Sequence, residues 1–280
     1  MAEIKPPRTY FSEVSSVEGY IEAISRWLNG AHLEDHTFLG SIWFRGSGKI
    51  FKIPLVPGVY RDEFTNKAKT FHSGDLENRR RHLERSILRE FRTAGAPFFN
   101  ANDIVEVYFT AQHCGMPTRL LDWTTNPLAA LFFAVQDITT HRSEGEVFAV
   151  EPKAILPSPV GKKRGEVLWN AEVTRHPYVA EAIGQTFWDS GNKRPPIIIP
   201  VVPDNRLGRI GQQSSCFTLH MHNAPSVDVQ DGKLAKFKIL VKNNTKAKIL
   251  NDLRRMNINQ FTIYNDLDHL SKDIKRVWQV

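Results

Sequence analysis

Residues 112–135 read QHCGMPTRLLDWTTNPLAALFFAV and place a turn, a polar segment and an apolar helix in one short run. Gly115 tolerates a positive φ and Pro117 restricts the residue before it, so the step between them predicts a tight turn. Asn126 is a good helix N-cap, and the proline after it suits the first helical position. Residues 128–135 carry no charged or hydrogen-bonding side chain, which predicts a helix buried on every side.

Two charged residues, Arg119 and Asp122, stand among apolar neighbours just before this helix. Because a buried charge needs a partner, an ion pair between them that braces the turn is favoured over direct catalysis. His113 is a candidate general base or ligand, although a histidine that holds the turn through a hydrogen bond is the commoner role. Trp123 is expected in the core first and against a ligand second.

The rest of the chain alternates helical and strand patterns without an internal repeat. Helices are expected at 17–29, 75–93, 103–113, part of 166–189, 245–255 and 267–278, and strands at 41–45, 146–150, 196–202, 217–221, 237–241 and 261–264. Residues 1–12 are expected to form a loose or docking segment. Because no internal linker is visible, we prefer a single α+β domain over residues 40–280, with the segment and helix of residues 1–39 packed on it.

Composition narrows the class of protein. The 280 residues are 41% hydrophobic and 24% charged, as in an ordinary globular protein. No apolar run approaches the roughly 18–20 residues of a membrane span, and the N-terminus lacks an apolar signal core, which predicts a cytoplasmic protein without a membrane partner. The two cysteines, Cys114 and Cys216, have no metal-site spacing, so two buried thiols and no metal are expected.

The formal net charge of +7 favours an anionic partner, and a solvated basic surface explains it about equally well. The densest basic cluster lies within residues 79–92. Because Glu77, Glu84 and Glu90 alternate with its arginines, the cluster predicts ion pairs on a solvated helix face rather than a nucleic-acid grip. The chain also lacks a phosphate-binding loop, a nucleophile elbow and a zinc-protease motif.

Several of these strings resemble one known family, the FRG domain. The resemblance is carried by Trp43-Phe44-Arg45-Gly46, by residues 112–124 and by the Asn-Pro-Leu-Ala-Ala-Leu run that begins at Asn126. It extends to a distal Arg209-Ile210 with Gln213 and Phe217, and to the ending at residues 264–268. The chain departs from the family at two positions: Ser215 replaces a glycine and Cys114 replaces the usual tyrosine.

The order of these residues is in turn similar to the ADP-ribosyltransferase superfamily, which implies a small split or mixed β-sheet decorated by helices and NAD as substrate. On this resemblance Arg45 clamps a phosphate, Gln213 lies against the ribose, and Trp123 or Phe133 offers a ring to nicotinamide. A structural ion pair of Arg45 with Asp122 in the core is an equally weighted alternative. His113 completes the catalytic candidates.

The other expected nucleotide contacts are Arg119, Asp122 and Asn126. A helix beginning at Asn126 offers free N–H groups and partial positive charge to a phosphate. We expect these distant residues to converge on one pocket.

Two functions of different class follow. The resemblance implies an ADP-ribosyltransferase or NAD glycohydrolase, with a nucleic acid or a protein as acceptor, acting as an effector in bacterial defence or as a toxin. The alternative is a non-catalytic module that binds a nucleotide or nucleic acid. A carboxylate within reach of the pocket favours the enzyme, because cleavage of the glycosidic bond leaves a positively charged ribose that a carboxylate stabilises.

Overall fold

The computed structural model describes most of the chain. The described residues are 9–30, 42–137, 143–156, 168–169, 179, 183–184, 197–202, 215–221, 226–229, 232–240 and 244–278. Among these residues no helix is long and apolar enough to cross a membrane.

The described strands form one mixed eight-stranded sheet in the order β1-β10-β4-β2-β3-β8-β7-β6, together with a small second sheet, β5-β9. The strands of the main sheet are β1 (Tyr10–Val14), β2 (Trp43–Ser47), β3 (Leu120–Thr124), β4 (Gly145–Val150), β6 (Leu168–Trp169), β7 (Ile198–Val202), β8 (Ser215–His220) and β10 (Leu234–Ile239). Those of the small sheet are β5 (Ile155–Leu156) and β9 (Asp228–Val229).

The main sheet is split between β2 and β3. These neighbours are paired only at Phe44 and Thr124, whereas β2 pairs with β4 along its whole length and β3 does the same with β8. The sheet therefore consists of two half-sheets, β1-β10-β4-β2 and β3-β8-β7-β6. The predicted α+β domain with a split, mixed sheet is confirmed.

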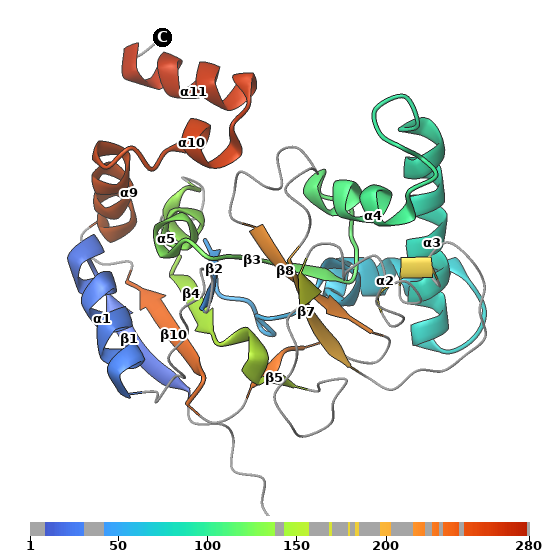
Figure 1. Ribbon diagram of the computed structural model, residues 1–280, viewed down its shortest axis with the longest axis horizontal. Helices are drawn as coiled ribbons and strands as arrows, with labels where there is room; N and C mark the ends of the chain where they lie inside the picture. The colour runs from blue at the N-terminus through green and yellow to red at the C-terminus, as the bar shows by residue number, and fades with distance from the viewer. Residues whose placement is uncertain are drawn as a thin grey trace, which may run out of the picture.

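The helices form two groups around the half-sheets (Figure 1). The helices are α1 (Val17–Gly30), α2 (Asp62–Phe71), α3 (Leu76–Ala94), α4 (Ile104–His113), α5 (Pro127–Val135), α9 (Thr245–Arg255), α10 (Gln260–Tyr264) and α11 (Leu267–Trp278), with short 3-10 turns at Gly58–Tyr60 and Pro152–Ala154. In Figure 1, α1 and α9 lie beside β10, whereas α2, α3 and α4 lie beyond β8 and β7.

Each helix group has its own core. Tyr20 and Trp27 of α1 share a buried cluster with Phe132 of α5, Phe237 of β10 and Leu253 of α9. A second cluster joins α3 and α4 to β3, β7 and β8, and a third packs the opposite side of the sheet against the β5-β9 pair. The site described below lies where α5 crosses from one half-sheet to the other.

The local signals around α5 act as predicted. Gly115 has a φ of 82°, and the Asn126 side chain accepts hydrogen bonds from the N–H groups of Leu128 and Ala129. The helix is buried over most of its surface, although Leu128 and Phe133 are only partly covered.

Two predictions of secondary structure were wrong. Residues 260–264 form a helix instead of a strand, because Asn259 and Thr262 make a capping box whose reciprocal hydrogen bonds fix a helix start. Helix α2 was not predicted at all. Residues 10–14, within or next to the segment expected to be loose or docking, form an edge strand parallel to β10, which agrees with docking.

The prediction of partial helix over residues 166–189 falls mostly outside the described residues, and the described pair Leu168–Trp169 is a strand. Both described thiols are free, but only Cys216 is buried. Cys114 is exposed because it follows the last turn of α4, so the prediction of two buried thiols was wrong for it.

Candidate functional site

Gly46 explains why β2 and α5 lie so close together. A Cβ atom at this position would lie 1.8 Å from the backbone oxygen of Ala130, inside α5. Only glycine lets the strand backbone approach the helix in this way. The neighbouring Arg45 is thereby fixed at the split between the half-sheets.

Arg45 reaches across the split to Asp122 on β3. Its Nη1 donates to the backbone oxygen of Asp122 at 2.7 Å and lies 3.7 Å from the carboxylate Oδ2. Among the described residues, Nε and Nη2 of Arg45 have no hydrogen-bond partner. One edge of the guanidinium is therefore held by the protein and the other edge is available to a ligand.

The carboxylate of Asp122 is in turn held by Gln112 at the end of α4. Nε2 of Gln112 donates to Oδ2 of Asp122 at 2.8 Å. Thr118 donates to Oε1 of Gln112 and accepts from the N–H of Leu120. This relay connects α4, the turn and β3, and it fixes the orientation of the Gln112 amide.

Two pockets share Arg45, Gln112 and Asp122, which we call the polar wall. The first, the aromatic pocket, has a volume of about 570 Å³. Its remaining lining residues are Phe44, Gly46, His113, Cys114, Trp123, Thr124, Phe133, Ser215, Phe217, Tyr264, Asp266 and His269. The volume and the mixture of rings and polar groups are those of a small-molecule site.

The second pocket, the basic pocket, has a volume of about 690 Å³ and is lined on the far side by Arg61, Glu63, Lys67 and apolar residues of α2 and α3. Burial lowers the pKa of Arg45; Asp122 opposes this effect and the nearby charge of Arg61 adds to it. Both guanidinium groups remain charged near neutral pH. The three cations Arg45, Arg61 and Lys67 outnumber the two carboxylates of the lining, so the basic pocket suits an anionic group.

Several residues expected at the site do line it. Arg45, His113, Asp122, Trp123 and Phe133 all face the aromatic pocket. Trp123 is nevertheless mainly a core residue, since it is almost fully buried and its Nε1 donates to Thr218. Gln213 lies outside the described residues, so its role stays a prediction.

Arg119 is not part of either pocket, and its expected ion pair with Asp122 was wrong. Residues three apart near a strand project to opposite faces, because side chains alternate with a period of two. Arg119 is buried and its Nε lies 3.1 Å from Oε2 of Glu84 on α3. Burial acts to lower the pKa of Arg119, but the carboxylate of Glu84 more than offsets it, so the pKa is raised.

Asn126 does not offer a phosphate site. Its Oδ1 accepts hydrogen bonds from the N–H groups of Leu128 and Ala129, and its backbone oxygen accepts one from the N–H of Ala130. These are the first amides of α5, because residue 127 is a proline. The prediction that this helix start binds an anion is therefore corrected: it is closed by its own cap.

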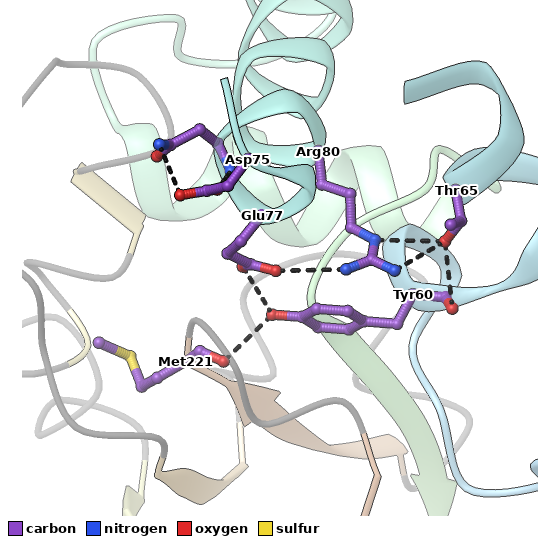
Figure 2. A network of polar contacts seen from close by, with 7 residues as sticks. Tyr60, Thr65, Asp75, Glu77, Arg80 and Met221 are labelled. Carbon is purple, nitrogen blue, oxygen red and sulfur yellow. Dashed lines mark hydrogen bonds and ion pairs between the residues drawn. The ribbon is translucent and has the colours of Figure 1, made fainter. Parts of the chain in front are cut away.

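The basic cluster on α3 holds helices together (Figure 2). Arg80 lies between Glu77 and Thr65, and the Tyr60 hydroxyl donates to Glu77 and lies within hydrogen-bond distance of the Met221 carbonyl. Arg79 and Arg92 donate to backbone oxygens. Because these arginines already bind groups of the protein, they are less available to the phosphates of a nucleic acid.

Sequence reasoning missed four important residues. Glu84 was read as solvated, although its spacing of four from Leu88 puts it on the apolar face of α3. Tyr264, Asp266 and His269 form the far wall of the aromatic pocket. The resemblance of residues 264–268 to the family's ending was the signal that could have found the first two.

No curated protein and no solved structure matches the chain. The model of the FRG domain matches residues 40–143, which include β2, the polar wall, α5 and the turn at Gly115. The extension of the same family to residue 280 stays a prediction. The chain thus contains an FRG domain over residues 40–143.

Proposed function

We propose that the protein binds a nucleotide containing a diphosphate across the two pockets, and that NAD is its substrate for ADP-ribosyl transfer or glycosidic hydrolysis. The observation that carries the proposal is Arg45, held by Asp122 on one edge and open on the other, in the wall that both pockets share. A guanidinium edge binds two phosphate oxygens at once, which an ammonium group cannot do.

The chemistry of the two pockets supports a dinucleotide. The basic pocket, with Arg61 and Lys67, would take the anionic part, and the aromatic pocket would take a flat ring beside Phe133 or Trp123. Asp122 places a carboxylate in the aromatic pocket, where a positively charged ribose would form after loss of nicotinamide. This carboxylate favours an enzyme over a binding module.

Calorimetry and a nicotinamide-release assay would test the proposal with NAD, reduced NAD and ADP-ribose. We expect Arg45→Ala to weaken NAD binding by about 10- to 100-fold, since a hydrogen bond to a charged group contributes about 1.5–3 kcal/mol, and Arg45→Lys to fall between this variant and wild type. Arg255→Ala is the matched control, because Arg255 is 82% exposed and lies on α9, outside both pockets.

Three results would separate the alternatives. Binding with nicotinamide release by wild type supports the enzyme, and binding without release in the presence of nucleic-acid and protein acceptors supports the non-catalytic module. No binding of any of the three nucleotides at millimolar concentration would reject the nucleotide site. An Arg45→Ala protein that binds as tightly as wild type would remove Arg45 from it.

A further inference from the structure

His269 and Asp266 form a histidine–carboxylate pair in the wall of the aromatic pocket opposite β2 and β3. Nδ1 of His269 lies 2.8 Å from each carboxylate oxygen of Asp266. The carboxylate is an acceptor, so it holds the proton of the neutral ring on Nδ1. Nε2 is then left with its lone pair, and among the described residues it has no hydrogen-bond partner.

The imidazole ring is also fixed from its flat side. It stacks on Tyr264 with ring centroids 4.1 Å apart and an angle of 17° between the planes. The Tyr264 hydroxyl is hydrogen-bonded to the side-chain amide of Gln136, the C-cap residue of α5, at 3.0 and 3.2 Å. Both the tautomer and the orientation of the ring are therefore set before any ligand arrives.

Capping of α11 alone does not account for this arrangement. As a cap, Asp266 needs only to accept the backbone N–H of His269, which it does at 2.8 Å. Asp75 and Asp103 cap α3 and α4 through their side chains without a histidine partner among the contacts described. At α11 the same carboxylate also orients a titratable ring that borders a cavity.

We propose that His269 is the general base for the acceptor hydroxyl, or for water, and that Asp266 is its positioning residue. This inference rests on the proposed function. In the step, the acceptor oxygen forms a bond to the anomeric carbon of the NAD ribose while the bond from that carbon to nicotinamide breaks. Nicotinamide leaves as a neutral molecule with the electron pair of that bond, and Nε2 of His269 takes the proton of the acceptor.

Three variants test the pair by kinetics. We expect His269→Gln to lower the kcat of nicotinamide release at least about 100-fold, the usual scale of general-base catalysis. Asp266→Asn should lower it at least about 10-fold while the Kd for NAD stays within about threefold, because asparagine still caps the helix but no longer carries the charge that fixes the tautomer. Asp268→Asn removes the same charge from an exposed position of the same helix turn and should behave as wild type.

Nitrogen-15 NMR of labelled imidazole gives a readout that does not require turnover. The His269 signals are identified by their loss in His269→Gln, and we expect the Nδ1–H tautomer in wild type and a mixture in Asp266→Asn. An Nε2–H tautomer in wild type would overturn the inference, whatever the result with NAD. So would normal turnover by His269→Gln. If wild type neither binds nor cleaves NAD, the proposed function fails, and the general-base role fails with it.

Discussion

Glu84 and Arg119 are both buried, and the carboxylate of one lies against the guanidinium of the other. The Tyr108 hydroxyl joins them, donating to Glu84 at 2.8 Å and accepting from the N–H of Arg119 at 2.9 Å. The three residues connect α3, α4 and the start of β3 directly behind the polar wall. The pair therefore sets the position of the strand that carries Asp122.

We expect Glu84→Ala to lower the free energy of unfolding by about 3–5 kcal/mol, because it leaves the Arg119 charge buried without its carboxylate. Asp122→Ala should change it by less than about 1 kcal/mol, because the Asp122 side chain is 54% exposed and Arg45 keeps its hydrogen bond to the backbone oxygen of residue 122. Urea unfolding of both variants checks this. Equal destabilisation by the two changes would show that Asp122 is structural.

The two thiols should differ in reactivity. Burial raises the pKa of Cys216, which disfavours its thiolate, whereas Cys114 is exposed at the edge of the aromatic pocket. Titration with a thiol reagent should label Cys114 alone in the native protein and both residues after unfolding. A nucleotide in the aromatic pocket should slow the labelling of Cys114; unchanged labelling at saturating nucleotide would place the ligand elsewhere.

Single residues show where sequence reasoning stops. The apolar context of Arg119 correctly indicated burial and a need for a partner, but Asp122 was the nearest acid only in sequence. Whether it could pair depended on strand alternation, and the true partner, Glu84, is 35 residues away. Long-range pairing of this kind is decided by packing, which a single sequence does not encode locally.

Among the elements, the close contact between β2 and α5 is the most sensitive to substitution. We expect Gly46→Ala to lower the free energy of unfolding by more than about 3 kcal/mol, because its methyl group would meet the helix backbone, which has no side chain to move aside. Gly30→Ala is the control, since nothing lies within 4 Å of a Cβ there. Thermal unfolding checks both, and a stable Gly46→Ala protein would mean that α5 can shift away from β2.

Elements with strong local signals were predicted correctly, and those fixed by distant partners were not. Helices α3, α4 and α5 have side-chain caps and clear apolar faces. Residues 261–264 read FTIY, whose β-branched and aromatic side chains favour a strand, but the capping box before them prevails. Strand β1 exists because it pairs with β10, more than 200 residues later in the chain.

At the scale of the whole molecule, three buried tyrosines report on three separate parts of the structure. Burial raises the pKa of Tyr20 in α1, of Tyr60 before α2 and of Tyr108 in α4, with the carboxylates of Glu77 and Glu84 adding to the effect at the last two. Their protons therefore stay bound in the folded state at a pH where the unfolded chain releases them.

The buried tyrosines make the protein less stable at alkaline pH. Below about pH 10, the ordinary pKa of tyrosine, this contribution to stability is fully present. Above it the unfolded state binds fewer protons, so the free energy of unfolding falls by about 1.4 kcal/mol per pH unit for each buried tyrosine. Tyrosinate absorbance should rise in an early reversible phase and again together with unfolding. A single early phase would contradict the burial of these residues.

The general position of the site could also be predicted from the sequence. Isolated polar residues within apolar segments indicate side chains that the fold brings together in one pocket. Arg45, His113 and Asp122 do converge on one pocket. The basic pocket could not be predicted, since Lys67 lies on α2 and Arg61 directly before it, and the polar composition of α2 gave no clear helical pattern. Of the wall made by α10 and α11, the helix α11 was predicted, but α10 was taken for a strand because residues 261–264 are β-branched or aromatic.

The single pair of Phe44 and Thr124 between the half-sheets has a mechanical consequence. No other backbone pair among the described residues joins β2 to β3, whereas β2 pairs with β4 and β3 pairs with β8 at every position. Side chains therefore carry most of the attachment: Trp43 and Trp123 share one buried cluster, and Arg45 donates to the backbone oxygen of Asp122. The contact that shapes the pockets is thus also one of the fastenings between the two halves of the sheet.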